Sequence, residues 1–250
     1  MPVNKPFHRI CRPFIDGSYS NSGQSEYINH PKYALSPEHY IRSFKIILDD
    51  LKMLFNYVEP CDTNLSCYSF KIHELLLRSC IEVEANCKAI LFENGFVKKS
   101  DWNMGDYRKL EKSHHLSSYF VKLPLWKGEK NVRQPFHSWK IDDKSLTWYQ
   151  TYNQTKHNRH NAFCEAKFDH MLDSICGLLV LLSSQFYRND FSPSDTLLSC
   201  GGPNDDFESA IGDYFRIKFP YDWDDDMKYN FNCEKLLNES NPFESYNYND

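Results

Sequence analysis

Apolar side chains recur at helical spacing in the segment that follows Ser36-Pro37-Glu38. They are Phe44, Ile47, Leu48, Leu51, Leu54, Phe55 and Val58. This spacing is typical of an amphipathic helix with one buried face. Ser36 is expected to cap free amides, Pro37 fits the first turn and Glu38 complements the positive end of the helix. The pattern predicts a helix from Ser36 that ends before Pro60.

A second stripe predicts a helix over residues 68–93. Its apolar positions are Ile72, Leu75, Leu76, Val83, Cys87, Ile90 and Leu91. Asn94-Gly95 is a typical C-terminal cap. The connection between the two helices, around residues 61–67, is short and polar, so we expect an antiparallel hairpin. Glu74, Arg78 and Glu82 are spaced four apart and predict an ion-pair ladder, although Arg78 could instead point into a shared site.

The most apolar segment predicts a third long helix over about 162–187. It is apolar nearly all round from Ile175 to Leu182, which is typical of the centre of a bundle. A break is expected around His160-Asn161, with Asn161 as N-cap. A shorter helix is predicted over about 103–117, whereas Pro and Gly in residues 118–143 predict a connection with little regular structure.

These patterns predict a mainly α protein organised around a helical bundle. Residues 1–35 are expected to form an irregular N-terminal arm, residues 36–190 the bundle domain, and residues 191–250 a short mixed α/β extension packed on the bundle. Within that extension, Phe215 to Phe219 alternates as a strand does, and residues 222–226 predict an acidic turn.

Composition narrows the functional classes. With 41% hydrophobic and 16% aromatic residues the chain has material for a core, and its formal charge of −5 requires any RNA contact to come from a local basic patch. The nine cysteines form no CxxC pair, so we expect buried thiols, no metal site and a reducing compartment. No apolar run has the length of a membrane span. The protein is therefore expected to be cytoplasmic.

Candidate chemistry is concentrated between Tyr149 and Asn161. If this segment is helical, Asn153, His157 and His160 share one face, at spacings of four and three. Lys156 and Arg159 lie on a neighbouring face. Imidazoles beside fixed cations suit acid/base chemistry on a phosphodiester, because the cations stabilise developing negative charge. The alternative is a solvated, polar helix end.

Aromatic residues surround this segment and continue along the preceding connection. They are Trp126, Phe136, Trp139, Trp148, Tyr149 and Tyr152. Side chains of this kind can stack bases. The alternative is that they pack the connection onto the bundle.

The order of these elements resembles the HEPN superfamily of small helical bundles. The resemblance covers about residues 38–187 and is carried by the stretch from Tyr152 to His157 and by the stretch from Ile81 to Ala89 in the second helix. Many members cut RNA in bacterial defence and toxin systems. The resemblance implies a metal-independent ribonuclease without a cofactor, active as a homodimer, with His157 and His160 as acid/base residues, Asn153 beside them, and Lys156, Arg159 and Tyr152 contacting RNA.

The chain departs from the nuclease motif of that family at one position. The motif has an Arg four to six residues before the His, and the residue five before His157 is Tyr152. This departure favours an alternative function, a non-catalytic module that binds nucleotide or protein. A purely structural role is a third alternative. Arg108 and His114 form a second formal match to the motif, in the shorter helix.

Overall fold

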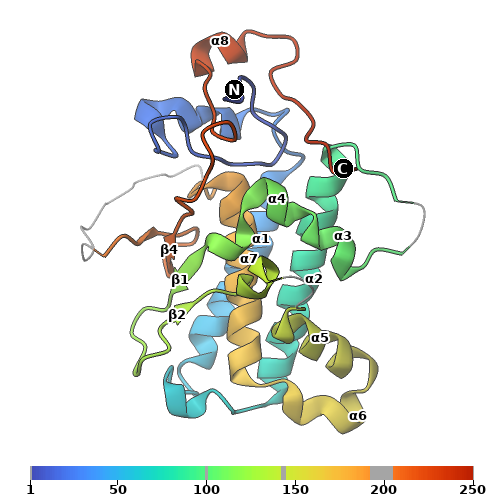
Figure 1. Cartoon of the computed structure of the whole chain (residues 1–250). Coiled ribbons are helices and arrows are strands. Elements are labelled where there is room, and N and C mark those ends of the chain that lie inside the picture. Colours follow the sequence, from blue (N-terminus) through green and yellow to red (C-terminus); the bar gives the residue numbers. More distant parts are fainter. Residues whose placement is uncertain (1, 99–100, 142–144, 192–204, 250) are drawn as a thin grey trace.

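The computed structural model describes residues 2–98, 101–141, 145–191 and 205–249 (Figure 1). The helices are α1 (Pro37–Leu54), α2 (Phe70–Glu93), α3 (Met104–Arg108), α4 (Leu110–His114), α5 (Thr147–His157), α6 (Arg159–Ala162), α7 (Phe168–Phe186) and α8 (Cys233–Leu237). Short 3-10 turns are η1 (Asn21–Asn29), η2 (Asp62–Asn64), η3 (Leu116–Ser118), η4 (His137–Lys140) and η5 (Phe163–Glu165). The strands are β1 (Phe120–Lys122), β2 (Val132–Arg133), β3 (Glu208–Ser209) and β4 (Arg216–Lys218). The predicted mainly α class is confirmed.

Helix α7 lies at the centre, beside the long α1–α2 hairpin (Figure 1). Its side chains from Ile175 to Leu182 are buried all round, because α1, α2 and α5 all pack against it. Ser79 of α2 and Ser174 of α7 share a hydrogen bond of 2.6 Å in this interface. The prediction that this apolar segment forms the buried centre is confirmed.

Of the predicted caps of the two hairpin helices, the one at the start of α1 is wrong and the one at the end of α2 is confirmed. Helix α1 begins at Pro37, but Ser36 has a φ of 47° and its side chain caps no amide, so the predicted Ser36 cap is wrong. Helix α2 is instead capped by Ser69, whose Oγ accepts from the Ile72 amide. Asn94 and Gly95, which has a φ of +79°, end α2 as predicted.

The predicted ladder on α2 is only partly present. Arg78 contacts Glu74 at 3.3 Å and also pairs with Asp50 of α1. Glu82 is not among the partners of Arg78 in the described residues. Arg78 therefore links the two helices of the hairpin.

The connection over residues 118–143 contains strands that the sequence did not predict. Strand β1 pairs antiparallel with β2 and with β4, giving the sheet order β2-β1-β4-β3. Val121 lies opposite both Arg133 and Ile217. The strands are too short to show a period of two, and their pairing joins distant parts of the chain. The predicted strand at 215–219 is confirmed as β4.

The start of α7 differs from the prediction of a helix over 162–187. Helix α5 ends at His157, and Asn158 leaves helical geometry with φ −133° and ψ 49°. Helix α7 begins at Phe168, whose amide donates to the Cys67 carbonyl at 2.7 Å, and the Asp169 amide donates to Leu65 at 3.0 Å. The α1–α2 connection thus satisfies the first amides of α7, and this tertiary contact fixes its start.

The N-terminal arm and the C-terminal segment pack together at one end of the bundle, whereas α6 lies at the other end (Figure 1). Isolated bridges join Val3 and Phe14 to Tyr229. Arg9 of the arm is fully buried, and its guanidinium donates to Glu93 at 2.7 Å and to Gln185 at 2.9 Å. The arm is therefore part of the core.

The eight cysteines that the structure describes are free thiols. Cys80, Cys87 and Cys176 are buried, as predicted. In the same described residues, no helix combines the length and the apolarity that a bilayer crossing requires.

Candidate functional site at the junction of α5 and α6

Helix α5 is held in place by aromatic side chains. The indole of Trp148 donates to the Pro135 carbonyl at 2.9 Å and lies against Gly177 of α7, where a Cβ would be 3.1 Å from the ring. The Tyr149 hydroxyl donates to Glu84 of α2 at 2.8 Å. Trp148 and Tyr149 thus pack α5 onto the bundle, which was the alternative to base stacking for these two residues.

Tyr152 faces the protein interior. Its side chain is fully buried, and its hydroxyl accepts a hydrogen bond of 3.0 Å from the Lys156 ammonium. The ammonium also lies over the Tyr152 ring, 5.0 Å from its centroid. The prediction that Tyr152 contacts RNA directly is therefore corrected, because a buried ring offers no face to a base. Its observed role is to orient Lys156, whose pKa is raised by this hydrogen bond.

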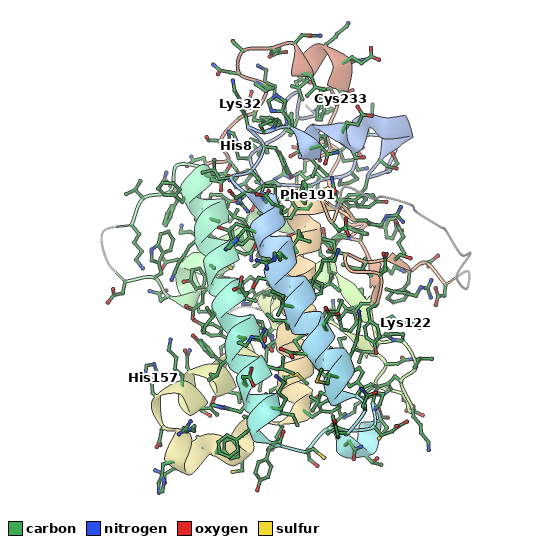
Figure 2. All side chains as sticks on the ribbon, turned by 180° about the vertical axis from the view of Figure 1, so that it is seen from behind. His8, Lys32, Lys122, His157, Phe191 and Cys233 are labelled. Carbon is green, nitrogen blue, oxygen red and sulfur yellow. The ribbon has the colours of Figure 1, made fainter. Side chains whose placement is uncertain are left out.

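The remaining predicted residues are exposed. Asn153 and His157 lie one turn apart on α5, and Arg159 and His160 lie on α6. The single helical face predicted for Asn153, His157 and His160 is not formed, because Asn158 interrupts the helix between the two histidines. His157 projects from the end of the bundle opposite to His8 and Cys233 (Figure 2). Neither terminal segment covers it.

Two further histidines, His73 and His170, lie around the same junction, and the sequence analysis selected neither as a candidate. Burial lowers the pKa of His73 on α2, and the nearby charge of Arg159 lowers it further. His170 on α7 contacts the Thr151 hydroxyl through Nδ1 at 3.1 Å, and burial lowers its pKa. His73 follows Ile72 of the apolar stripe on α2. Only the tertiary structure shows that the charge of Arg159 and the ring of Phe163 lie close to it.

An aromatic surface adjoins His73 at the same end of the molecule. The Phe163 ring lies 4.7 Å from Phe70, 5.7 Å from Tyr68 and 5.6 Å from the His73 imidazole, measured between centroids. Phe70 is 72% exposed and Tyr68 53% exposed. These residues lie outside the aromatic stretch that the sequence singled out, and their rings are accessible to a planar ligand.

The second formal motif, Arg108 and His114, is not an exposed pair. His114 is fully buried, and its Nε2 contacts the Arg9 carbonyl at 3.1 Å while Nδ1 contacts the Ser113 hydroxyl at 2.7 Å. Because a carbonyl only accepts, Nε2 carries the proton and Nδ1 accepts. Burial lowers the pKa of His114 to about 3. A neutral, fully engaged imidazole of this kind has a structural role.

No group of three or more His, Cys, Asp or Glu side chains within the described ranges is arranged to hold a metal ion. The arrangement at the α5–α6 junction offers instead two exposed imidazoles, an exposed guanidinium and an oriented ammonium. A scan against protein-family models found no match, and searches among curated proteins and among solved structures also returned none.

Proposed function

We propose that this chain is a HEPN-like protein of bacterial defence or toxin systems that cleaves RNA without a metal ion. The observation that carries the proposal is the exposure of His157 and His160 beside Arg159 at the free end of the bundle. Polar and cationic groups at this end face solvent and are not covered by either terminus (Figure 2). As the resemblance implies, the active form would be a cytoplasmic homodimer.

In the proposed reaction, His157 takes the proton from a ribose 2′-hydroxyl. The 2′ oxygen attacks the adjacent phosphorus, the bond to the 5′ oxygen breaks, and His160 donates a proton to that leaving oxygen. The products are a 2′,3′-cyclic phosphate and a 5′-hydroxyl end. One imidazole acts as base and the other as acid, the two roles that an imidazole can take in general acid–base catalysis.

Arg159 and Lys156 would stabilise the negative charge on the phosphate. Lys156 uses one of its three N–H donors on Tyr152, which leaves two for phosphate oxygens. Asn153, one turn before His157 on α5, would hydrogen-bond the ribose or the phosphate. The exposed rings of Phe70 and Tyr68 would stack a neighbouring base.

A non-catalytic binding module is the second candidate function. The specific observation in its favour is that Tyr152, an uncharged and buried side chain, stands at the position where the nuclease motif has an arginine. Such a module would hold a nucleotide, an RNA or a protein partner at the same surface. Its RNA affinity would fall with salt concentration, because Lys156 and Arg159 would displace counterions.

The test is cleavage of a total RNA or tRNA pool by the purified protein in the presence of a chelator. The His157→Ala variant is expected to lose at least about 100-fold in rate, the contribution typical of an acid/base side chain. His137→Ala is the matched control, since His137 is also exposed but lies on η4. Circular dichroism of each variant confirms that folding is intact.

Equal cleavage by wild type and His157→Ala would contradict the proposed site. If wild type leaves RNA intact but binds it in a salt-dependent manner, the binding module replaces the nuclease. If it neither cleaves nor binds RNA, both RNA-directed functions are excluded.

A further inference from the structure

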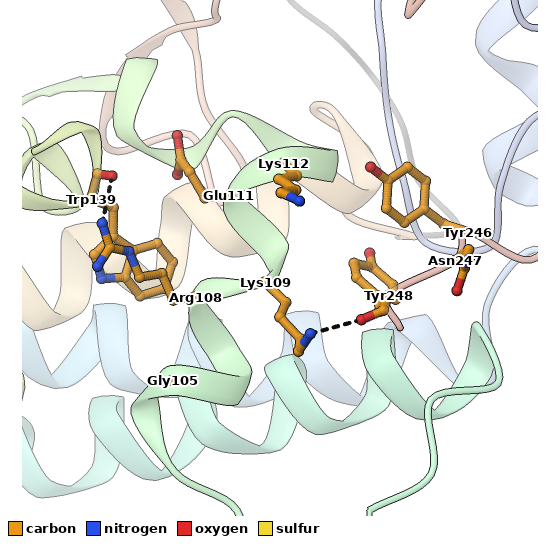
Figure 3. A pocket seen from close by; sticks show the side chains of 9 residues that line it. All are labelled: Gly105, Arg108, Lys109, Glu111, Lys112, Trp139, Tyr246, Asn247 and Tyr248. Atoms are coloured by element: carbon orange, nitrogen blue, oxygen red, sulfur yellow. Dashed lines mark hydrogen bonds between the residues drawn. The ribbon is translucent and has the colours of Figure 1, made fainter. Parts of the chain in front are cut away.

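A pocket of about 450 Å³ lies away from the α5–α6 junction, between α3–α4 and the last residues of the chain (Figure 3). Its volume is in the range of small-molecule sites. One side is formed by α3 and α4, and the other by the C-terminal segment 246–248.

Successive turns of α3 and α4 bring three cations to this pocket: Arg108, Lys109 and Lys112. Lys109 donates to the Tyr248 carbonyl at 3.0 Å and so ties the C-terminal segment to the helix. Lys112 is exposed, and in the part of the chain that the structure describes its ammonium has no hydrogen bond or ion pair. An ammonium in this position is available to an anionic ligand.

The acidic residue of the pocket does not pair with Lys112. The Glu111 carboxylate accepts hydrogen bonds from the Ser117 amide at 3.0 Å and from the Ser117 hydroxyl at 2.5 Å. Figure 3 shows it directed away from the Lys112 ammonium. The positive charge of Lys112 at the pocket is therefore not neutralised by Glu111.

A buried arginine adds to this charge. Arg12 is 2% exposed, and its guanidinium donates only to carbonyl oxygens, those of Ser113 at 3.3 Å and Met227 at 3.2 Å. Among the described residues it has no carboxylate partner, and its Nη2 has no hydrogen bond. It lies 5.4 Å from the centroid of the Tyr246 ring, which lines the pocket.

Three aromatic side chains also line the pocket. Trp139 and Tyr248 are almost fully buried and form the inner surface, while Tyr246 is partly exposed at one side. Arg108 donates to the Trp139 carbonyl at 3.4 Å (Figure 3). A planar guanidinium and aromatic rings both stack against nucleobases.

We propose that this pocket binds a nucleoside phosphate. The phosphates would contact Lys112 and Lys109, and the base would stack against Tyr246. The combination of lysines with an aromatic ring favours this ligand class. A simple anion would not use the ring, and an apolar ligand would not use the lysines. The site is separate from the α5–α6 junction and does not depend on the function proposed there.

The experiment is isothermal titration of the full chain with ATP, AMP, adenosine and inorganic tripolyphosphate, without added metal. ATP is expected to bind more tightly than either adenosine or tripolyphosphate. Adenosine lacks the phosphates that would contact the lysines, and tripolyphosphate lacks the base that would stack against Tyr246. Lys112→Ala is expected to weaken ATP binding about tenfold, the loss of one charge-assisted hydrogen bond at a solvated site. Lys112→Arg should retain most of the affinity.

Lys130→Ala is the matched control, because Lys130 is an exposed lysine on the β1–β2 loop, outside this pocket. The proposal is overturned if ATP does not bind at millimolar concentration, or if Lys112→Ala binds ATP as wild type does. It is also overturned if tripolyphosphate binds as tightly as ATP, since the pocket would then recognise only charge. RNA cleavage by the same variants is scored separately and has no bearing on these outcomes.

Discussion

At the scale of single residues, burial decides the protonation state of the histidines around the core. His114 is enclosed by the arm, by Ser113 and by Tyr248, whose hydroxyl contacts the Ser113 hydroxyl at 2.8 Å. A charge in this position would be desolvated, which explains why the pKa of His114 is lowered to about 3. The same physical effect lowers the pKa of His73 and of His170.

The low pKa of His114 predicts a specific dependence of stability on pH. In the unfolded chain this imidazole titrates near its ordinary value of 6.5, so below that pH the unfolded state binds more protons than the folded state. The contribution of His114 to stability is therefore complete above pH 6.5 and is lost as the pH falls toward 3. The maximum slope from one such group is about 1.4 kcal/mol per pH unit.

Urea unfolding at pH 7.5 and pH 5 checks this prediction. The loss of unfolding free energy between the two pH values should be smaller in His114→Gln than in wild type. His137→Gln, at an exposed position on η4, should show the same loss as wild type. An identical loss in His114→Gln and wild type would mean that His114 does not carry this proton linkage.

At the scale of elements, the position of α5 depends on its contact with α7. Gly177 leaves space for the Trp148 ring, and the Phe136 ring lies beside it, 3.6 Å from the point that a Cβ on Gly177 would occupy. The contact of the Trp148 ring with Gly177 fixes the rotation of α5 about its axis. Tyr152 therefore faces the interior, and Asn153 and His157 face solvent. The candidate site therefore depends on a glycine that is far from it in sequence.

Substitutions at Gly177 test this dependence. Gly177→Ala stabilises the helix by about 1 kcal/mol through its higher helix propensity, but the added Cβ makes a tight contact with Trp148. Because these two effects oppose each other, we expect the unfolding free energy to lie within about 1 kcal/mol of wild type. Gly177→Leu has no space and should lose about 1–3 kcal/mol by overpacking. Denaturant unfolding followed by tryptophan fluorescence measures both. If Gly177→Leu were as stable as Gly177→Ala, the contact between Trp148 and residue 177 would not be rigid.

At the scale of the whole molecule, the two ends of the chain are joined through α2. The Asn94 side chain donates to the His8 carbonyl at 2.9 Å and accepts from the Tyr246 amide at 2.8 Å. One side chain thus holds both the N-terminal arm and the C-terminal segment against the bundle. The same C-terminal segment forms one side of the pocket beside α4.

Asn94→Ala should therefore act on both ends together. Two partly buried backbone groups, the His8 carbonyl and the Tyr246 amide, would lose their partner. A fully buried unsatisfied group costs about 1–3 kcal/mol, so for these two partly buried groups we expect a loss of about 2–4 kcal/mol of unfolding free energy. Hydrogen exchange should increase at the Tyr246 amide and in the arm around His8. Asn238→Ala is the control, because Asn238 also follows a helix but donates only to the Glu234 carbonyl within α8. Unchanged exchange at Tyr246 in Asn94→Ala would show that Asn94 does not tie the two ends.

The sequence by itself determined the long helices and their relative burial. The stripes in 38–58 and 68–93 and the apolar run from Ile175 to Leu182 are local patterns, and a helix that is apolar all round has to be surrounded. The concentration of polar and cationic residues around His157 was also visible in the sequence, because these residues are neighbours in the chain, but the single helical face predicted for Asn153, His157 and His160 was wrong. These features were predictable because they depend on spacing within one element.

Only the tertiary structure decided which side chains face solvent and which distant segments meet. The burial of Tyr152 follows from the contact of Trp148 with Gly177. The start of α7 at Phe168 follows from hydrogen bonds that its first amides donate to the α1–α2 connection. Strands β1 and β4 are stabilised by each other although they are far apart in the chain. The pocket beside α4 exists because the last residues return to it. None of these outcomes has a local signal, since each one depends on contacts between residues that are far apart in sequence.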